Sequence, residues 1–396
     1  MDTQTVESLM AAASRIPLGQ PEKLELLERA VALADLQNDL MAGFEARDEL
    51  IEAAGMGGHP EKTLVAFAWM LAQWDKHGED ELGADEHSLL WKYKWVINTL
   101  WEFPSIAATQ IEAAFDDFQA RLERGGYSLR TLHYFRWKYA HHQGNWAEAE
   151  SERTVWQRSS DDSMGDCSAC EAHFLTDYLA AQKRDTEALE AARLILSGRQ
   201  RCAEVPHVTY GVLLEPMLRL GQLEDACEAH LRGYRMVRDN PEFLATVGEH
   251  LAFLAYTHNT GPALALLERH LSWALETANL QARFEFYRST LPLWNRLRDT
   301  GELEVKFRAP SGFTLEAEGG VYALDALEGW FGAQLEHLAA RFDARNENGY
   351  FSSRLKADLE LLERVGPLSL KAAPGKAQKQ GNQKQGNQGL GNWGQK

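Results

Sequence analysis

Seven short turn-like breaks divide most of this chain at near-regular intervals. Each break is flanked by amphipathic runs of helical length, and successive breaks are 37 to 45 residues apart. This spacing is typical of stacked helical hairpins. The sequence therefore predicts an all-α fold, arranged as a right-handed α-solenoid that presents a surface to other macromolecules. The breaks lie at Gly19, Gly58, Phe103, Gly144, Arg184, Gly221 and Asn259.

Residues that start helices or let helices approach recur around these breaks. A Pro-Glu-Lys sequence follows the first two breaks, at Pro21 and Pro60. Proline suits the first helical turn because its missing N–H would have no partner there. An alanine follows three later breaks by four or five residues, at Ala149, Ala188 and Ala226. A small side chain at that position allows the second helix of a hairpin to cross close to the first.

This pattern resembles the tetratricopeptide repeat (TPR) superfamily. Hairpins of that superfamily have aromatic or leucine positions in the first helix, a glycine-containing turn and an early alanine in the second helix. The best matches run from Trp137 to Ala149 and from Leu213 to Ala226. The spacing exceeds the usual 34 residues, and the closing proline is mostly absent, so the repeats are degenerate. The resemblance, which is to bacterial repeat proteins, implies protein or peptide binding and names no activity.

The sequence predicts three regions: the repeats in 1–300, an insert with capping helices in 301–365, and a disordered tail in 366–396. Residues 302–308 alternate with period two before Pro310 and Gly312, which predicts a short irregular or β insert near 302–312. Helical patterns resume at 323–342 and 353–365 and predict helices that cap the last repeat. The tail is rich in Gln, Gly, Asn and Lys and cannot bury a core. It is interpreted as a solubility tail or as an arm for an acidic partner, with Trp393 as its anchor.

The overall charge limits the classes of partner. The net charge of −17 and pI near 5.3 argue against a broad nucleic-acid or anionic-membrane surface, because such surfaces need clustered Lys and Arg. The N-terminal residues lack the basic start of a secretory signal, and no apolar run is long enough to span a bilayer. Four cysteines in a chain of 396 residues fit a reducing compartment, so a cytoplasmic location is predicted. The oligomeric state stays open.

Three cysteines and one histidine form the first candidate site. Two cysteines three residues apart can hold one zinc ion at a helix start, and a structural zinc site needs four such ligands. The first pair is Cys167 and Cys170, and the second pair, Cys202 and His207, follows about one repeat later. Both pairs are therefore expected at the starts of neighbouring first helices. The alternatives are buried cysteines that tolerate tight packing, and a redox pair at Cys167 and Cys170. The predicted ligands of a structural zinc ion, the only cofactor considered, are Cys167, Cys170, Cys202 and His207.

The second candidate site is a set of polar residues between aromatic ones. Trp91, Trp95, Phe135 and Tyr139 have the spacing of a core-facing stripe. The interleaved cations fall on predicted first helices, which line the concave groove of TPR proteins. There they are expected to bind a peptide carboxylate, although an ordinary solvated face is the alternative. The predicted peptide-binding residues are Lys92, Lys94, Asn98, Arg136, Lys138 and His142.

No motif in the sequence indicates catalysis. A Gly-x-Ser-x-Gly elbow and a Gly-x-x-x-x-Gly-Lys phosphate loop are both absent. The predicted function is a protein- or peptide-binding scaffold, not an enzyme. The alternatives are a regulatory sensor whose shape changes when a peptide binds, and an enzyme built on helical repeats.

Overall fold

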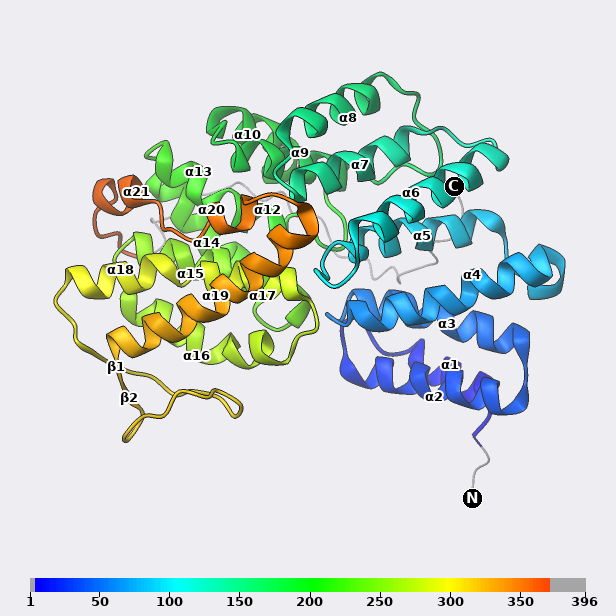
Figure 1. Ribbon diagram of the computed structural model, residues 1–396, viewed down its shortest axis with the longest axis horizontal. Coiled ribbons are helices and arrows are strands. Elements are labelled where there is room, and N and C mark those ends of the chain that lie inside the picture. Colours follow the sequence, from blue (N-terminus) through cyan, green and yellow to red (C-terminus); the bar gives the residue numbers. More distant parts are fainter. Residues whose placement is uncertain (1–3, 371–396) are drawn as a thin grey trace, which may run out of the picture.

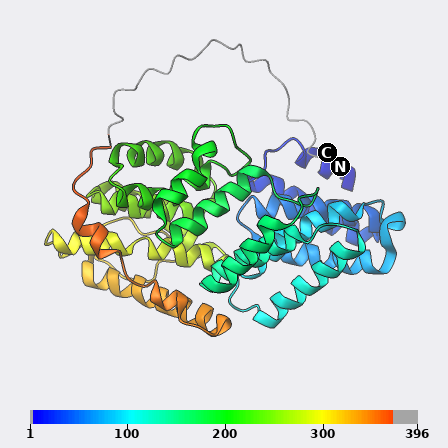
Figure 2. The same ribbon diagram turned by 90° about the horizontal axis from the view of Figure 1, so that it is seen from above.

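The computed structural model describes residues 4–370, so most of the predicted tail lies outside the described residues. This part of the chain is all-helical except for one two-stranded sheet (Figure 1). In both views, the first and last helices lie at opposite ends of the long axis (Figures 1 and 2). The helices of the first half are α1 (Val6–Ala13), α2 (Pro21–Gln37), α3 (Leu40–Gly55), α4 (Pro60–Leu82), α5 (Glu86–Leu100), α6 (Ala108–Arg124), α7 (Arg130–His142), α8 (Trp146–Arg158), α9 (Ser168–Ala181) and α10 (Asp185–Ala191).

The second half begins and ends with short helices, and its longest helix is α19. Residue 240 is followed by the 3-10 turn η1 (Pro241–Phe243), which leads directly into α15. The remaining elements are α11 (Arg193–Leu196), α12 (His207–Val212), α13 (Leu214–Arg219), α14 (Leu223–Val237), α15 (Leu244–Tyr256), α16 (Thr260–Glu276), α17 (Leu280–Arg288), α18 (Leu291–Asp299), β1 (Glu304–Lys306), β2 (Val321–Ala323), α19 (Leu324–Asn346), α20 (Tyr350–Ser353) and α21 (Leu359–Arg364).

Each of the seven predicted breaks lies between two helices. Gly19, Gly58, Gly144 and Gly221 have φ between 71° and 81°, the left-handed region that glycine enters without steric cost. Helices on either side of a break pack together, as α3 with α4, α7 with α8, and α15 with α16. Helices two apart also pack, as α3 with α5, α5 with α7, and α15 with α17. Hairpins therefore follow one another along the chain.

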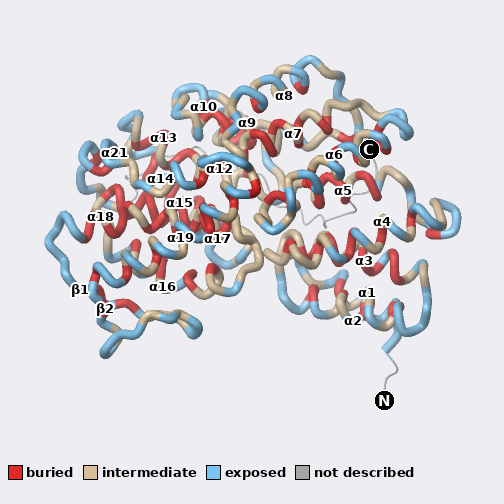
Figure 3. Tube along the Cα trace, viewed as in Figure 1, coloured by how far each residue is buried: buried red, intermediate tan, exposed pale blue. Residues whose placement is uncertain are grey.

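The predicted alanines lie where the helices of a hairpin meet. Ala149, Ala188 and Ala226 are fully buried, which agrees with the close approach expected from their position. Most of the buried apolar residues belong to one core that extends from Ala13 to Val365. The central helix α15 is buried along almost its whole length, whereas the β1–β2 loop is mostly exposed (Figure 3).

The predicted insert contains the short sheet. Strands β1 and β2 pair antiparallel, with Val305 opposite Tyr322. Both side chains are buried, and the Tyr322 ring packs against Phe307, which is buried on the same strand face as Val305, so the alternation in 302–308 marks one apolar face. The second strand leads directly into α19, which packs on α17 and α18.

The chain after α19 reaches far beyond the last hairpin. The Arg345 guanidinium donates hydrogen bonds to the Trp101 carbonyl and to Nε2 of His142, at 3.2 and 2.8 Å. Farther on, Leu362 O accepts a bond from Arg296, and Leu368 N donates to Thr257 O. We call residues 345–370 the return segment. The sequence predicted only capping of the last repeat, but the return segment also ties α5 and α7 to the C-terminal end.

A second long-range contact joins the two halves of the chain. The Asn240 side-chain amide, just before η1, donates to Met56 O at 3.0 Å, beside the Gly58 turn.

None of the helices within residues 4–370 combines the length and apolarity needed to cross a bilayer.

Trp137 tests the packing of successive hairpins. Its fully buried indole on α7 contacts Trp156 of α8 and Phe174 of α9, at ring-centroid distances of 5.2 and 4.5 Å. We expect Trp137→Ala to lower the free energy of unfolding by about 3–5 kcal/mol. Urea unfolding followed by circular dichroism measures this, and Leu36→Ala, at a position 80% exposed, is the control. Equal unfolding midpoints for the two variants would contradict the assigned role of Trp137.

Candidate functional site

Residues of both candidate sites lie at the interface between α7 and α9. Tyr134 and Trp137 of α7 pack edge-to-face against Phe174 of α9, with ring centroids 5.6 and 4.5 Å apart. The Tyr134 hydroxyl also donates to the Cys170 carbonyl at 3.4 Å. Lys138, on the next turn of α7, lies over the Phe174 ring at 5.5 Å. The aromatic packing thus fixes the cysteines and Lys138 relative to each other.

The structure brings three of the four predicted metal ligands together. Cys167 is the N-cap of α9, and its Sγ accepts the Cys170 amide N–H at 3.4 Å. The Cys170 Sγ lies 3.3 Å from that of Cys167 and 3.2 Å from that of Cys202. All three sulfurs lie within 4.8 Å of one another, and all three residues are free thiols. Cys202 comes from the loop before α12, so the group joins two successive hairpins.

The fourth predicted ligand, His207, is not part of this group. It begins α12, and its ring stacks on Phe243 with centroids 5.7 Å apart. Its Nδ1 is buried and has no hydrogen-bond partner within residues 4–370, and burial lowers the pKa of the imidazole. The spacing placed His207 on the correct helix, but the turn from Cys202 to α12 points the ring toward Phe243.

A buried lysine lies next to the cysteines. The Lys94 side chain is fully buried, and its Nζ donates to Met164 O at 2.8 Å and to an Asp166 carboxylate oxygen at 3.0 Å. The same Nζ lies 3.2 Å from the centre of the Trp91 ring. Burial lowers the pKa of Lys94, whereas Asp166 and Cys170 favour its charged form. Lys94 therefore holds the loop that leads into Cys167.

Hydrogen bonding among the thiols makes their acidities unequal. Hydrogen bonds with Cys170 and Cys202, and with the first amides of α9, lower the pKa of Cys167. The same sulfur contacts and burial raise the pKa of Cys170. Negative charge is therefore most favourable on Cys167, at the positive end of the α9 dipole.

Three of the six predicted peptide-binding residues are paired with acidic side chains. Lys92 pairs with Asp48 and Glu52 of α3. Lys94 is bonded to Met164 O and to the Asp166 carboxylate. Arg136 pairs with Glu112 of α6 at 2.9 Å.

The other three residues have few or no charged partners. His142 is buried, and its Nε2 accepts the hydrogen bond from Arg345. Asn98 is half-buried, with its side-chain oxygen unpartnered among the described residues. Lys138 is half-buried and has no ion pair in the described part of the chain. The assignment of all six residues to one binding surface stays a prediction.

Three carboxyl groups, two of which interact with the charge of Lys138, were missed by the sequence analysis. Glu102 follows α5, Glu204 precedes α12, and Glu242 lies in η1. Burial raises the pKa of Glu102 to about 8, while a hydrogen bond from Asn279 and the charge of Lys138 oppose the shift. Burial also raises the pKa values of Glu204 and Glu242, and each of these carboxyls repels another of the three. We call these three residues the carboxylate cluster.

A second charged group continues from α9 to α17. Burial raises the pKa of Glu249 on α15 well above its usual range, and Asp177 and Glu285 add repulsion. The Glu249 Oε2 is buried and has no partner among residues 4–370. Burial opposes ionisation of Glu285 as well, but Arg354 and Arg288 lower its pKa to about 2. No linear pattern distinguishes these acids, because the chain has 58 Asp and Glu residues.

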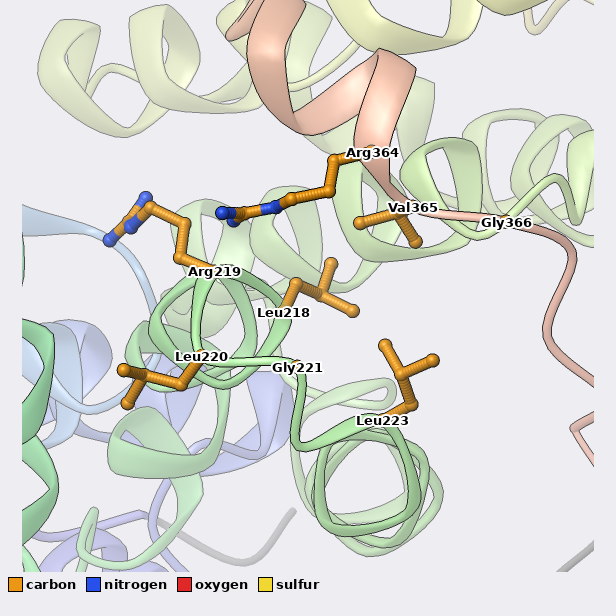
Figure 4. A pocket seen from close by; sticks show the side chains of 8 residues that line it. All are labelled: Leu218, Arg219, Leu220, Gly221, Leu223, Arg364, Val365 and Gly366. Atoms are coloured by element: carbon orange, nitrogen blue, oxygen red, sulfur yellow. The ribbon is translucent and has the colours of Figure 1, made fainter.

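A pocket of about 260 Å³ lies elsewhere, where the return segment meets the α13–α14 turn (Figure 4). Leu218, Leu223 and Val365 line it together with Arg219 and Arg364. Arg219 is already paired with Asp185 at 2.8 Å. The pocket therefore offers an apolar hollow with one cation, Arg364, at its rim, and no group suited to chemistry.

Comparison with known proteins gives no further constraint on the site. The chain matches no protein-family model and no curated protein sequence.

The raised pKa of Glu102 predicts a pH dependence of stability. Between the usual glutamate pKa near 4.5 and about 8, the folded chain binds more protons at this site than the unfolded chain. The contribution of Glu102 to the free energy of unfolding therefore falls as pH rises through this range. We expect Glu102→Gln to remove about 1–3 kcal/mol of this fall. Urea unfolding at pH 5.5 and pH 8.5 measures it, and identical pH dependence of the variant and the unmodified protein would contradict the prediction.

Proposed function

We propose that the chain is a TPR-like α-solenoid that binds a protein or peptide segment carrying basic side chains. The binding surface comprises the half-buried charged groups of α7, α9, α15 and α17 together with the carboxylate cluster. This proposal retains the predicted scaffold function, and it retains Lys138 as a residue of the binding surface. It replaces recognition of a ligand carboxylate with recognition of ligand cations.

The observation that carries the proposal is the continuous electrostatic link between these acids. Lys138 acts on Glu102 and Glu204, and it also lowers the pKa of His173 on α9. Asp177, one turn farther along α9, acts on Glu249 of α15. These helices follow one another through direct packing of α9 with α12, α12 with α15, and α15 with α17. These interactions support treating the acids as one surface built from successive hairpins.

The energetics favour a cationic ligand on this surface. A half-buried carboxylate without an ion-pair partner is costly, and this cost appears as the raised pKa values of Glu102, Glu204 and Glu249. An ammonium or guanidinium group from a ligand would lower those pKa values and gain charge-assisted hydrogen bonds. The net charge of −17 adds long-range attraction for such a segment.

The arrangement of hairpins also supports a binding scaffold. Helical-repeat proteins use the surface of successive first helices to hold extended partners. A cytoplasmic location remains part of the proposal, in accord with four cysteines that all carry free thiols.

Two pools of dye-labelled random decapeptides test the proposal. One pool has Lys and Arg as its charged residues, and the other has Asp and Glu, with equal apolar content. Fluorescence anisotropy is expected to detect binding of the basic pool, weakened by added salt. Glu204→Gln and Glu249→Gln should each reduce affinity by roughly 3- to 10-fold, because each removes one charge-assisted contact.

The matched control is Glu224→Gln, at an exposed position of α14. It has the same chemical change and should leave affinity unaltered. Equal binding of both pools, or no effect of Glu204→Gln and Glu249→Gln, would refute the proposed surface.

A further inference from the structure

The thiols of Cys167, Cys170 and Cys202 converge in a way that the binding function does not require. Two of the sulfurs come from the first turn of α9 and one from the loop before α12. Close contacts of 3.3 and 3.2 Å join them pairwise through Cys170. The fourth cysteine, Cys227, lies apart on α14 and contacts the Ser369 carbonyl.

We propose that these three cysteines bind one zinc ion as thiolates, with a fourth ligand supplied from solvent. Tetrahedral zinc with Zn–S bonds of about 2.3 Å holds its sulfur ligands about 3.8 Å apart. The two contacts through Cys170 need to lengthen by only about 0.5 Å to reach that spacing, and the third pair of sulfurs, Cys167 and Cys202, lies within 4.8 Å. Cys167 is exposed, so the fourth position faces solvent. Within the described residues, no His, Asp or Glu completes the group, and His207 is turned away.

The surroundings of the three sulfurs fix their positions and offer an amide donor to one of them. Three thiolates and one Zn²⁺ have a net charge of −1, which is costly to bury alone. The buried ammonium of Lys94, paired with Asp166 at 3.0 Å, anchors the loop that leads into Cys167 and so fixes the position of that sulfur. The N–H of Cys170 points at the Cys167 sulfur, as at helix N-termini that stabilise thiolates. A packing role for the cysteines would need neither the amide contact nor the cation.

A zinc ion at this position would act between hairpins. Cys170 is held at the α7–α9 interface because its carbonyl accepts a hydrogen bond from the Tyr134 hydroxyl. Cys202 is held by a hydrogen bond from its N–H to Val205 O at 3.0 Å. One ion therefore would fix the α12 loop, including Glu204, against α9. Because a metal bound only by the folded state adds its binding free energy to stability, zinc should stabilise this part of the chain.

Elemental analysis of the untagged full-length chain, purified with a reductant and without a chelator, tests the proposal. We expect one zinc per chain in the unmodified protein and in Cys227→Ser, the matched control. Cys170→Ser and Cys202→Ser should each retain at least about tenfold less zinc. Circular dichroism verifies that these variants keep their helical content.

A second measurement needs no variant. The unmodified protein is stripped with a chelator and titrated with Co²⁺, which should produce intense thiolate-to-cobalt absorption that saturates at one equivalent and disappears when Zn²⁺ is added. Zinc-free protein with three free thiols and no cobalt absorption would overturn the proposal. A Cys167–Cys170 disulfide in the reductant-purified protein would do the same, as would zinc retained equally by Cys170→Ser and Cys202→Ser.

Discussion

The aromatic packing between α7 and α9 is the interaction on which both candidate sites depend. Trp137 is surrounded by Trp156, Phe174 and Tyr178, so α8 and α9 are fixed against the same indole. Aromatic pairs have preferred geometries, so they fix the relative orientation of the helices as well as contributing the free energy of burial. Tyr134, one turn earlier on α7, donates a hydrogen bond to the Cys170 carbonyl and so positions the backbone at Cys170 relative to α7. Cysteine convergence and the position of Lys138 therefore follow from one interface.

Charge compensation explains the acidic character of the remaining surface. Most cations of the central helices are neutralised by neighbouring acids, as Arg136 is by Glu112, and Arg121 is by Asp75 and Asp117. The first pair joins α7 to α6, and the Arg121 pairs lie within α6 and between α6 and α4, where partly buried charges need partners. Within residues 4–370, no ion pair is formed by the carboxylate cluster or by Glu249, and burial raises their pKa values. The unpaired charge on the proposed surface is thus mainly negative, whereas the residues predicted from the sequence to bind a peptide are mainly cationic.

Local features could be predicted because they depend on residues close in sequence. The glycine turns, the buried alanines and the strand pattern at 302–308 each follow from backbone preference or periodicity. The meeting of three cysteines also followed from repeat spacing, since Cys167 and Cys202 begin neighbouring hairpins.

Contacts between distant residues could not be predicted in the same way. The return segment joins Arg345 to Trp101 across most of the chain, and no sequence period relates the two. The pairing of Lys92 with Asp48 depends on the rotation of α5 against α3, which periodicity leaves undetermined. His207 was predicted from its distance to the cysteines alone, but the direction of its ring is set by Phe243.

The central claim is that partners bind to the surface shared by α7, α9, α15 and α17. The most direct test places a photo-crosslinking amino acid at Asp177 on α9, and separately at Val155 on α8, in the full-length chain in its own cells. The two positions have similar exposure, 38% for the Asp177 side chain and 39% for Val155, but only Asp177 belongs to the proposed surface. The account predicts a discrete crosslinked protein from position 177 and none from position 155. Crosslinking from position 155 alone would contradict it.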